Sequence, residues 1–303
     1  MSTITRAQLL KELIPGLDTL FGLEYNTYEN QHTMIYEMET SERSFEEATN
    51  LSGFGAAPVK PEGTAIQYDT AQESYTQRYD HETIAMGFSL TEEAMEDNLY
   101  DSISKRYTKA MARSMAYTKQ VKAAAVLNNG FSTYQTGDGV SLYNTAHPLV
   151  SGGTLANRPI TAADLSEAAV ENMEIQIAGW VDERGLLINQ MPRKLVIPRQ
   201  LKYVATRILM SDLRPGTADN DVNANKEQRT IPEGWCINNY LTDPNAWFVI
   251  TDVPDGLTFY ERIAYQTNMD GDFDTGNVRY KARERYSFGV TNPRGTWGSP
   301  GTS

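Results

Sequence analysis

The stretch that most constrains this chain runs from residue 92 to residue 129 and has the pattern of one uninterrupted amphipathic helix. It contains neither Pro nor Gly. Ser89 followed by Glu92 fits a capping box at its start, and Asn128-Asn129-Gly130 supplies residues that tolerate a left-handed stop. At about 1.5 Å per residue the helix would be about 57 Å long, several times the usual three or four turns. Such a helix needs an equally long surface to lie along.

Apolar residues along this stretch recur at gaps of three, four or seven, which places them on one side of a helix. They are Met95, Leu99, Ile103, Ala110, Tyr117, Val121 and Ala124, whereas Asp97, Asp101, Lys105 and Lys119 fall largely on the other side. We therefore expect Met95, Leu99, Ile103, Tyr117 and Val121 to form the core contact of the helix. A long helix in an ordinary α+β domain, or a coiled coil, would give a similar pattern, although no strict heptad is sustained.

Composition and charge exclude several classes of protein. The chain has 303 residues, 40% of them hydrophobic, which is enough for a substantial core. Its 39 acidic and 27 basic residues give a net charge of -12, so sequence-specific DNA binding is not expected. The single cysteine, Cys236, cannot form an internal disulfide, and we find neither a signal peptide nor a membrane-spanning run. We expect synthesis in a reducing cytoplasm and no membrane partner.

The amino-terminal third predicts a short amphipathic helix followed by an extended arm. Pro15-Gly16 should break or bend the helix, and residues 26 to 88 then show strand signals around a Gly-rich stretch at 52 to 58. Too little apolar surface lies in this region for a core of its own. We therefore expect it to lie on a neighbouring subunit, with Phe54, Lys60, Tyr75 and Tyr79 as inter-subunit contacts. A flexible surface loop is the alternative.

The rest of the chain predicts a compact α/β region followed by long strands. Helices are expected from Thr161 or Asp164 to about residue 178 and over 200–210. Strands are expected over 194–197, 234–238, 247–251, 258–261 and 277–290, before a Gly- and Pro-rich tail from Asn292.

No constellation of residues in the chain indicates catalysis, a cofactor or a metal. None of the three histidines has a second at ligand spacing, and His147 before Pro148 suits a structural hydrogen bond. Cys236 lacks a protease signature and is expected to be a small buried hydrophobe. The acidic runs 219–225 and 270–276 fail as EF-hands at the positions of the Gly and the last Glu, so solvated turns are expected, although cation binding stays open.

The order of several short segments resembles the major capsid proteins of tailed double-stranded DNA bacteriophages, in the Mu-like major head subunit branch. Thr83 to Glu93 resembles the entry to the spine helix of that family. Later landmarks are Gly137-Asp138-Gly139 with Leu142, His147-Pro148-Leu149, Leu195 to Pro198, and Asn277 to Arg285. The resemblance spans nearly the whole chain. Each motif is weakly specific alone, but their order and spacing are hard to obtain otherwise.

The resemblance implies the Hong Kong ninety-seven type fold, an α+β fold with five parts. They are an N-terminal arm at 1–40, an extended loop at 41–90, a peripheral domain with the spine helix at 91–158, an axial domain at 159–249, and peripheral-domain strands with a C-terminal tail at 250–303. A long β-ribbon is expected in the peripheral domain. Some relatives crosslink a loop Lys to an Asn of a neighbour, but Lys60 has no identifiable Asn or Glu partners, so a noncovalent shell is expected.

The implied function is structural: copies of the chain assemble as hexamers and pentamers into an icosahedral viral head that holds double-stranded DNA. The resemblance implies a portal and a separate scaffolding protein, leaves a decoration protein open, and implies only loose, non-specific DNA contact. The protein would be a virion component assembled in the host cytoplasm. A bacterial nanocompartment shell of the same fold, or a calcium-dependent hydrolase or adhesin, are the alternatives. Shell size, triangulation number, host and N-terminal processing do not follow from the sequence.

Overall fold

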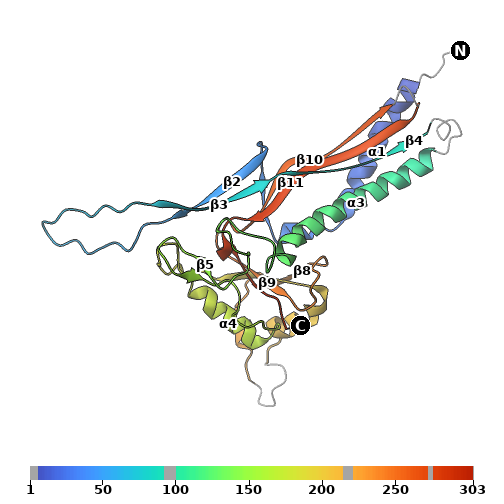
Figure 1. Cartoon of the computed structure of the whole chain (residues 1–303). Helices are drawn as coiled ribbons and strands as arrows, with labels where there is room; N and C mark the ends of the chain where they lie inside the picture. The colour runs from blue at the N-terminus through green and yellow to red at the C-terminus, as the bar shows by residue number, and fades with distance from the viewer. Residues whose placement is uncertain (1–5, 92–99, 214–220, 272–275, 303) are drawn as a thin grey trace, which may run out of the picture.

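The computed structural model describes residues 6–91, 100–213, 221–271 and 276–302, and it has an elongated part, a compact part and a projecting hairpin (Figure 1). Two four-stranded sheets organise the first two parts, with strand orders β1-β10-β11-β4 and β12-β9-β7-β8. The hairpin is the separate two-stranded sheet β2-β3. This mixture of helices and sheets confirms the α+β class.

The elongated part contains the long sheet and two helices that run beside it (Figure 1). Its elements are α1 (Arg6–Thr27), β1 (Glu37–Thr40), β4 (Glu82–Leu90), α3 (Tyr100–Asn128), β10 (Leu257–Gly271) and β11 (Val278–Val290). β10 and β11 form an antiparallel ribbon, β4 adds antiparallel to β11, and β1 adds parallel to β10. The expected long β-ribbon is therefore present, and β4 belongs to its sheet.

Both long helices cover the same face of this sheet. Tyr280 and Ala282 of β11 are buried together with Leu17 and Phe21 of α1 and with Met115 of α3. Alternate residues of a strand point to opposite faces, so the residues between them lie on the uncovered side. Helix α1 continues through Pro15-Gly16, and the expected break is absent because packing of its later turns outweighs the lost hydrogen bond.

Our prediction of the buried face of α3 was wrong for Tyr117, Val121 and Lys119. Tyr117 is 53% exposed and Val121 is 37% exposed, whereas Lys119, placed on the polar side, is 6% exposed. The buried face is formed mostly by small and polar residues: Ser104, Thr108, Met111, Ala112, Met115, Ala116, Lys119, Gln120, Ala123, Ala124, Val126 and Leu127. Small side chains let the helix approach α1 and the sheet closely, and this packing outweighs the hydrophobicity of Tyr117 and Val121.

Part of the helix prediction falls outside the described residues. Met95 and Leu99, with the capping residue Glu92, lie in the range 92–99, and the side chain of Ile103 is likewise not described. The helix ends at Asn128, as the Asn-Asn-Gly stop predicts.

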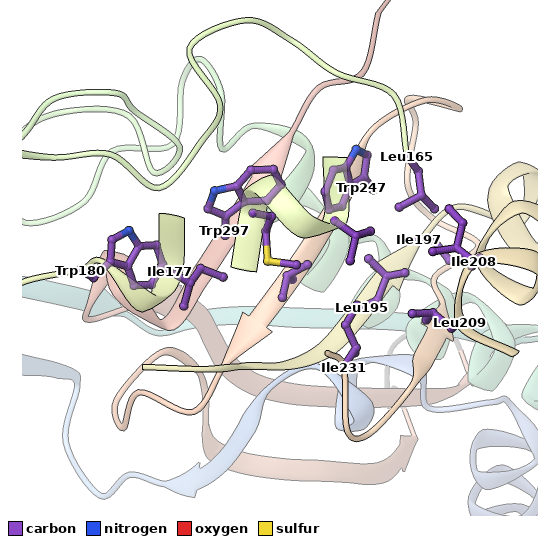
Figure 2. Close-up of a cluster of buried hydrophobic side chains, with 14 of the residues drawn as sticks. Leu165, Ile177, Trp180, Leu195, Ile197, Ile208, Leu209, Ile231, Trp247 and Trp297 are labelled. Carbon is purple, nitrogen blue, oxygen red and sulfur yellow. The ribbon is translucent and has the colours of Figure 1, made fainter. Parts of the chain in front are cut away.

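The compact part is built on the second sheet, with helices packed against it. Its elements are β5 (His147–Pro148), β6 (Thr154–Leu155), α4 (Glu167–Ala178), β7 (Pro192–Ile197), η2 (Arg199–Leu201), α5 (Lys202–Met210), α6 (Ala224–Glu227), β8 (Trp235–Ile237), β9 (Trp247–Thr251), η3 (Pro293–Gly295) and β12 (Thr296–Ser299). Figure 2 shows its core, in which Trp247 and Trp297 lie side by side with ring centroids 4.7 Å apart. Ser166, rather than Thr161 or Asp164, caps α4.

The expected Gly- and Pro-rich tail is a core strand instead. β12 pairs with β9, and Trp297 is only 2% exposed. Gly298 lies against the rings of Phe248 and Tyr143, where a Cβ atom would come within about 3 Å of both, so this glycine permits close packing. The glycines that suggested a loose tail therefore serve the core.

Candidate assembly surface

The hairpin formed by β2 (Phe45–Ser52) and β3 (Gln72–Asp80) projects away from the rest of the chain (Figure 1). Its tip, residues 53–71, is exposed except for the half-buried Gly55. Phe54 is 61% exposed, Val59 93% and Tyr68 92%, and Lys60 is exposed as well. A segment with large exposed apolar side chains and no core is typical of a surface that is covered in an assembly. Phe54 and Lys60 therefore stay predicted inter-subunit contacts.

The root of the hairpin is held in its own subunit. Tyr79 is 3% exposed, its hydroxyl lies 2.5 Å from Thr291 Oγ1, and its ring packs against Gly289. Asn50 donates to the Thr291 carbonyl at 3.1 Å. Tyr79 was therefore wrongly predicted as an inter-subunit contact, because its ring fills a space over a glycine of β11. Tyr75 is half-buried beside the same root and stays a prediction.

A second attachment joins the tip to the compact part. Asp69 accepts from Gly55 N at 2.7 Å and from Arg184 Nη2 at 2.9 and 3.0 Å. The backbone N–H groups of Gly55 and Thr70, with the Arg184 charge, lower the pKa of Asp69. Nothing in the single sequence connects Asp69 with a residue more than 100 positions later, so this contact could not be predicted.

A buried ion pair joins the two long helices to the sheet. Lys119 Nζ of α3 lies 2.8 Å from Glu284 Oε2 of β11, and the Tyr25 hydroxyl of α1 donates to the same oxygen at 2.8 Å. The ammonium also lies over three aromatic rings, those of Tyr25, Phe259 and Tyr286, at 5.0 to 5.7 Å from their centroids. Burial, and then the Glu284 carboxylate, raise the pKa of Tyr25. Lys119 and Glu284 lie far apart in the sequence, so the sequence alone did not predict this ion pair.

His147 has the structural role that its sequence context predicts. Its Nδ1 lies 2.5 Å from Asp138 Oδ2 and its Nε2 3.0 Å from the Leu142 carbonyl. Burial raises the pKa of Asp138, but hydrogen bonds from His147 and Thr136 outweigh it and leave that pKa lowered. These contacts fix the loop after α3 on the compact part. The buried Asn157 beside them, which donates to the carbonyls of Leu142 and Pro293, was not predicted.

The described residues offer no arrangement for metal chemistry. Among them, no group of three or more His, Cys, Asp or Glu side chains could hold a metal ion. Cys236 is buried, and burial raises the pKa of its thiol to about 11, which suits a small hydrophobe rather than a nucleophile. Both acidic runs extend outside the described residues, at 219–220 and 272–275. No described helix is both long and apolar enough to cross a membrane.

Comparison with known proteins identifies the family. A family model described as phage capsid protein matches residues 73–298, about three quarters of the chain. No curated protein matches the chain by sequence. The chain therefore belongs to the phage capsid protein family, and its function is that of a structural major capsid protein.

Solved structures share the fold across nearly the whole chain. The virus-like particle from Pyrococcus furiosus is 10% identical, with a TM-score of 0.53 and coverage of 95% of this chain and 99% of that one. The capsid of the empty GTA particle is 16% identical, with a TM-score of 0.56 and 89% of each chain covered. The procapsid of bacteriophage JBD30 is 14% identical, with a TM-score of 0.53 and coverage of 98% and 76%. At these identities the likeness concerns the fold alone.

Proposed function

We propose that this chain is the major head subunit of a tailed bacteriophage, and that many copies close into an icosahedral shell around packaged double-stranded DNA. The family match supports the capsid role. The projecting hairpin supports assembly through contacts between copies of the chain. Its tip exposes Phe54, Val59 and Tyr68, and a second copy that covers these side chains would remove their apolar surface from water. The role is mechanical and requires no catalytic group.

The proposed subunit has the parts that the family resemblance implies. The N-terminal arm (1–40), extended loop (41–90), peripheral domain (91–158 and 250–303) and axial domain (159–249) form one subunit of the shell. Strand pairing favours two adjustments: β4 belongs with the peripheral sheet and β12 with the axial sheet. Hexamers and pentamers, a portal and a separate scaffolding protein complete the proposed assembly, in the host cytoplasm. Contact with DNA is loose.

Deletion of residues 51–61 tests this function, because it removes the first half of the tip with the last two residues of β2 and no residue of β3. The variant subunit should stay soluble and folded, since all of these residues except Ser52 and Gly55 are exposed, but shell formation should stop or weaken. Electron microscopy and sedimentation of purified particles provide the measurement. Deletion of residues 151–153, which are also exposed and lie in the loop between β5 and β6, is the matched control. Shells as stable as those of the parent would show that the hairpin has no role in assembly.

The nanocompartment alternative is not favoured by the family match. Particles purified from infected or expressing cells distinguish the two functions, because a phage head contains DNA and a nanocompartment contains an enzyme. Nuclease-protected DNA of uniform length in the particles is the expected result. Particles that hold a single co-purifying enzyme and no DNA would reverse the assignment.

A further inference from the structure

The strand β4 forms one edge of the long sheet, and in the described part of the chain no strand pairs with its outer side. The sheet has the order β1-β10-β11-β4, so β4 pairs only with β11. It is nine residues long, and most of its residues are exposed. An edge strand presents a row of backbone N–H and C=O groups that can pair with a strand of another chain.

β4 lacks the features that usually protect an edge strand, which are short length, charged side chains and proline. From Thr83 to Leu90 there is no charged residue and no proline. The other edge strand of the same sheet, β1, has only four residues, and two of them are Glu37 and Glu39. β8, at an edge of the second sheet, has three residues. A long edge without such protection is a place where another chain can add a strand.

Apolar side chains follow this edge on the face of the sheet that α3 covers. Met86 pairs with the buried Ala282, so it points to that face, and it is 46% exposed. Ile84 and Phe88, two residues away on either side, are half-buried. The ring of Tyr107 in α3 lies 5.7 Å from that of Phe88 and is 53% exposed. The subunit thus leaves an apolar strip along β4 incompletely buried.

The sequence of β4 is self-complementary when two copies pair antiparallel about a two-fold axis perpendicular to the sheet. Residues opposite each other must then point to the same face of the joined sheet. A register centred on Met86 meets this condition and pairs all nine residues of each strand. It places Ile84 opposite Phe88 of the other copy, and Thr83 opposite Ser89. Pairs of an aromatic with a β-branched residue, and pairs of hydroxyl residues, are favourable across antiparallel strands.

The charge of the protein also favours contact at this strand. Each copy has a net charge of -12, so two copies repel each other over most of their surfaces. β4 has a single charged residue, Glu82, and its carboxylate pairs with Lys122 of α3. Two copies can therefore approach at β4 without bringing uncompensated charges together.

We propose that β4 pairs with β4 of a second copy of this chain, so that two long sheets join edge to edge with Met86 at the two-fold axis. The inference rests on the proposed shell function and adds a symmetric contact to it, in which both copies use the same surface. The contact does not involve the projecting hairpin. It supplies backbone hydrogen bonds along β4, and Ile84 of each copy meets Phe88 and Tyr107 of the other.

A disulfide across the axis tests the pairing directly. Opposite residues of an antiparallel pair have Cα atoms about 4.5–5.5 Å apart, which a disulfide can bridge. Shells of the Met86→Cys variant, treated with a mild oxidant, should give disulfide-linked dimers on a non-reducing gel. Parent shells are the control, since their single cysteine, Cys236, is buried. Intact Met86→Cys shells that give no dimers would overturn the proposal.

Two further cysteine variants test the direction and the register of the strands. Thr83→Cys shells should give no dimers, because the two positions would lie about 20 Å apart along the joined strands. Shells assembled from equal amounts of Thr83→Cys and Ser89→Cys subunits should give mixed dimers. Dimers from Thr83→Cys alone, or their absence from the mixture, would contradict the antiparallel register.

Charges placed at the axis supply an independent test. Met86→Lys and Met86→Glu subunits should each assemble with about tenfold lower yield, because like charges would face each other, whereas an equal mixture should restore most of the yield. Met191→Lys, at another exposed methionine, is the matched control and should assemble like the parent. Circular dichroism checks that each variant is folded, and the cysteine variants decide if one is not.

The outcomes separate this contact from the function on which it rests. Folded Met86→Lys subunits that assemble like the parent would refute the β4 pair. A mixture as defective as either variant alone would indicate that a different partner covers the edge, which also overturns the proposal. If the parent chain forms no shells, the proposed function fails and the β4 pair with it, whereas parental shells without the expected disulfides refute only the β4 pair.

Discussion

Removal of the buried ammonium at Lys119 should be among the most destabilising single changes in the elongated part. The side chains of Lys119 and Glu284 are 8% and 0% exposed, and the two charged atoms lie 2.8 Å apart. Lys119→Met leaves the Glu284 carboxylate buried with only the Tyr25 hydroxyl as a donor. Loss of one partner from a buried pair costs about 3–5 kcal/mol, a large share of the 5–15 kcal/mol that is typical of a protein.

The surface pair of Arg113 and Glu24 is the matched comparison, since it also joins α3 to α1. Arg113 Nε lies 2.5 Å from Glu24 Oε1, but the arginine side chain is 63% exposed. Arg113→Met should therefore cost only about 0.2–1 kcal/mol, in the range of exposed ion pairs. Urea unfolding of free subunits, followed by circular dichroism, should show a midpoint lowered by roughly 1–2 M for Lys119→Met and by much less for the control.

The double variant Lys119→Met/Glu284→Leu separates a buried charge from lost packing. Replacement of both charges by apolar groups removes the uncompensated carboxylate, so the double variant should be more stable than either single one. It should still fall short of the parent by about 1–3 kcal/mol, because the Tyr25 hydroxyl loses its acceptor. The reasoning is refuted if Lys119→Met costs no more than Arg113→Met, or if the effects of the two single changes simply add.

Three further changes test other parts of the structure. Burial, and then the Lys119 charge, lower the pKa of His32 to about 4, so the unfolded chain takes up a proton between pH 6.5 and 4 that the folded chain does not. The free energy of unfolding should fall by about 2.5 kcal/mol from pH 7.5 to 4.5, and His32→Phe should flatten this profile; an unchanged slope would contradict the assignment. Gly289→Ala should cost about 1–3 kcal/mol in urea unfolding, because a Cβ there meets a tyrosine ring, whereas Gly271→Ala, with open space, should cost under about 0.5 kcal/mol; equal costs would contradict the packing. Arg184→Ala should speed hydrogen exchange and proteolysis in the hairpin tip without a change in the urea midpoint, and unchanged exchange would show that the tether is unimportant.

The sequence predicted elements whose signals are local. The end of α3 at Asn128 follows from Asn-Asn-Gly, and the strand over residues 277–290 follows from its alternation. The exposed tip around Phe54 follows from the scarcity of apolar residues near it. These features depend only on residue propensities, hydrophobic periodicity and turn-forming residues, all of which can be read from a single sequence.

The wrong predictions all concern burial. Whether a side chain is buried depends on what its helix or strand packs against. Tyr117 and Val121 are more hydrophobic than Ala112 and Ala116, yet the small residues face the sheet because they allow closer packing. Lys119 of α3 can be buried because Glu284 of β11 supplies the opposite charge. Tyr79 is buried because Gly289 leaves room for its ring. Each outcome requires a tertiary partner, and a single sequence does not identify such partners.

The pairing of β4 with β11 sets the order in which this chain can fold. Leu90 pairs with Val278 and Glu82 with Tyr286, so the paired residues are about 200 positions apart in sequence, a long-range contact that forms slowly. Most of the compact part lies between them, but its last core strand, β12, follows β11 in the chain. During synthesis β4 therefore stays unpaired until β11 has emerged from the ribosome. Until then the unpaired edge is open to aggregation, and because the long sheet is incomplete, assembly with finished subunits is delayed.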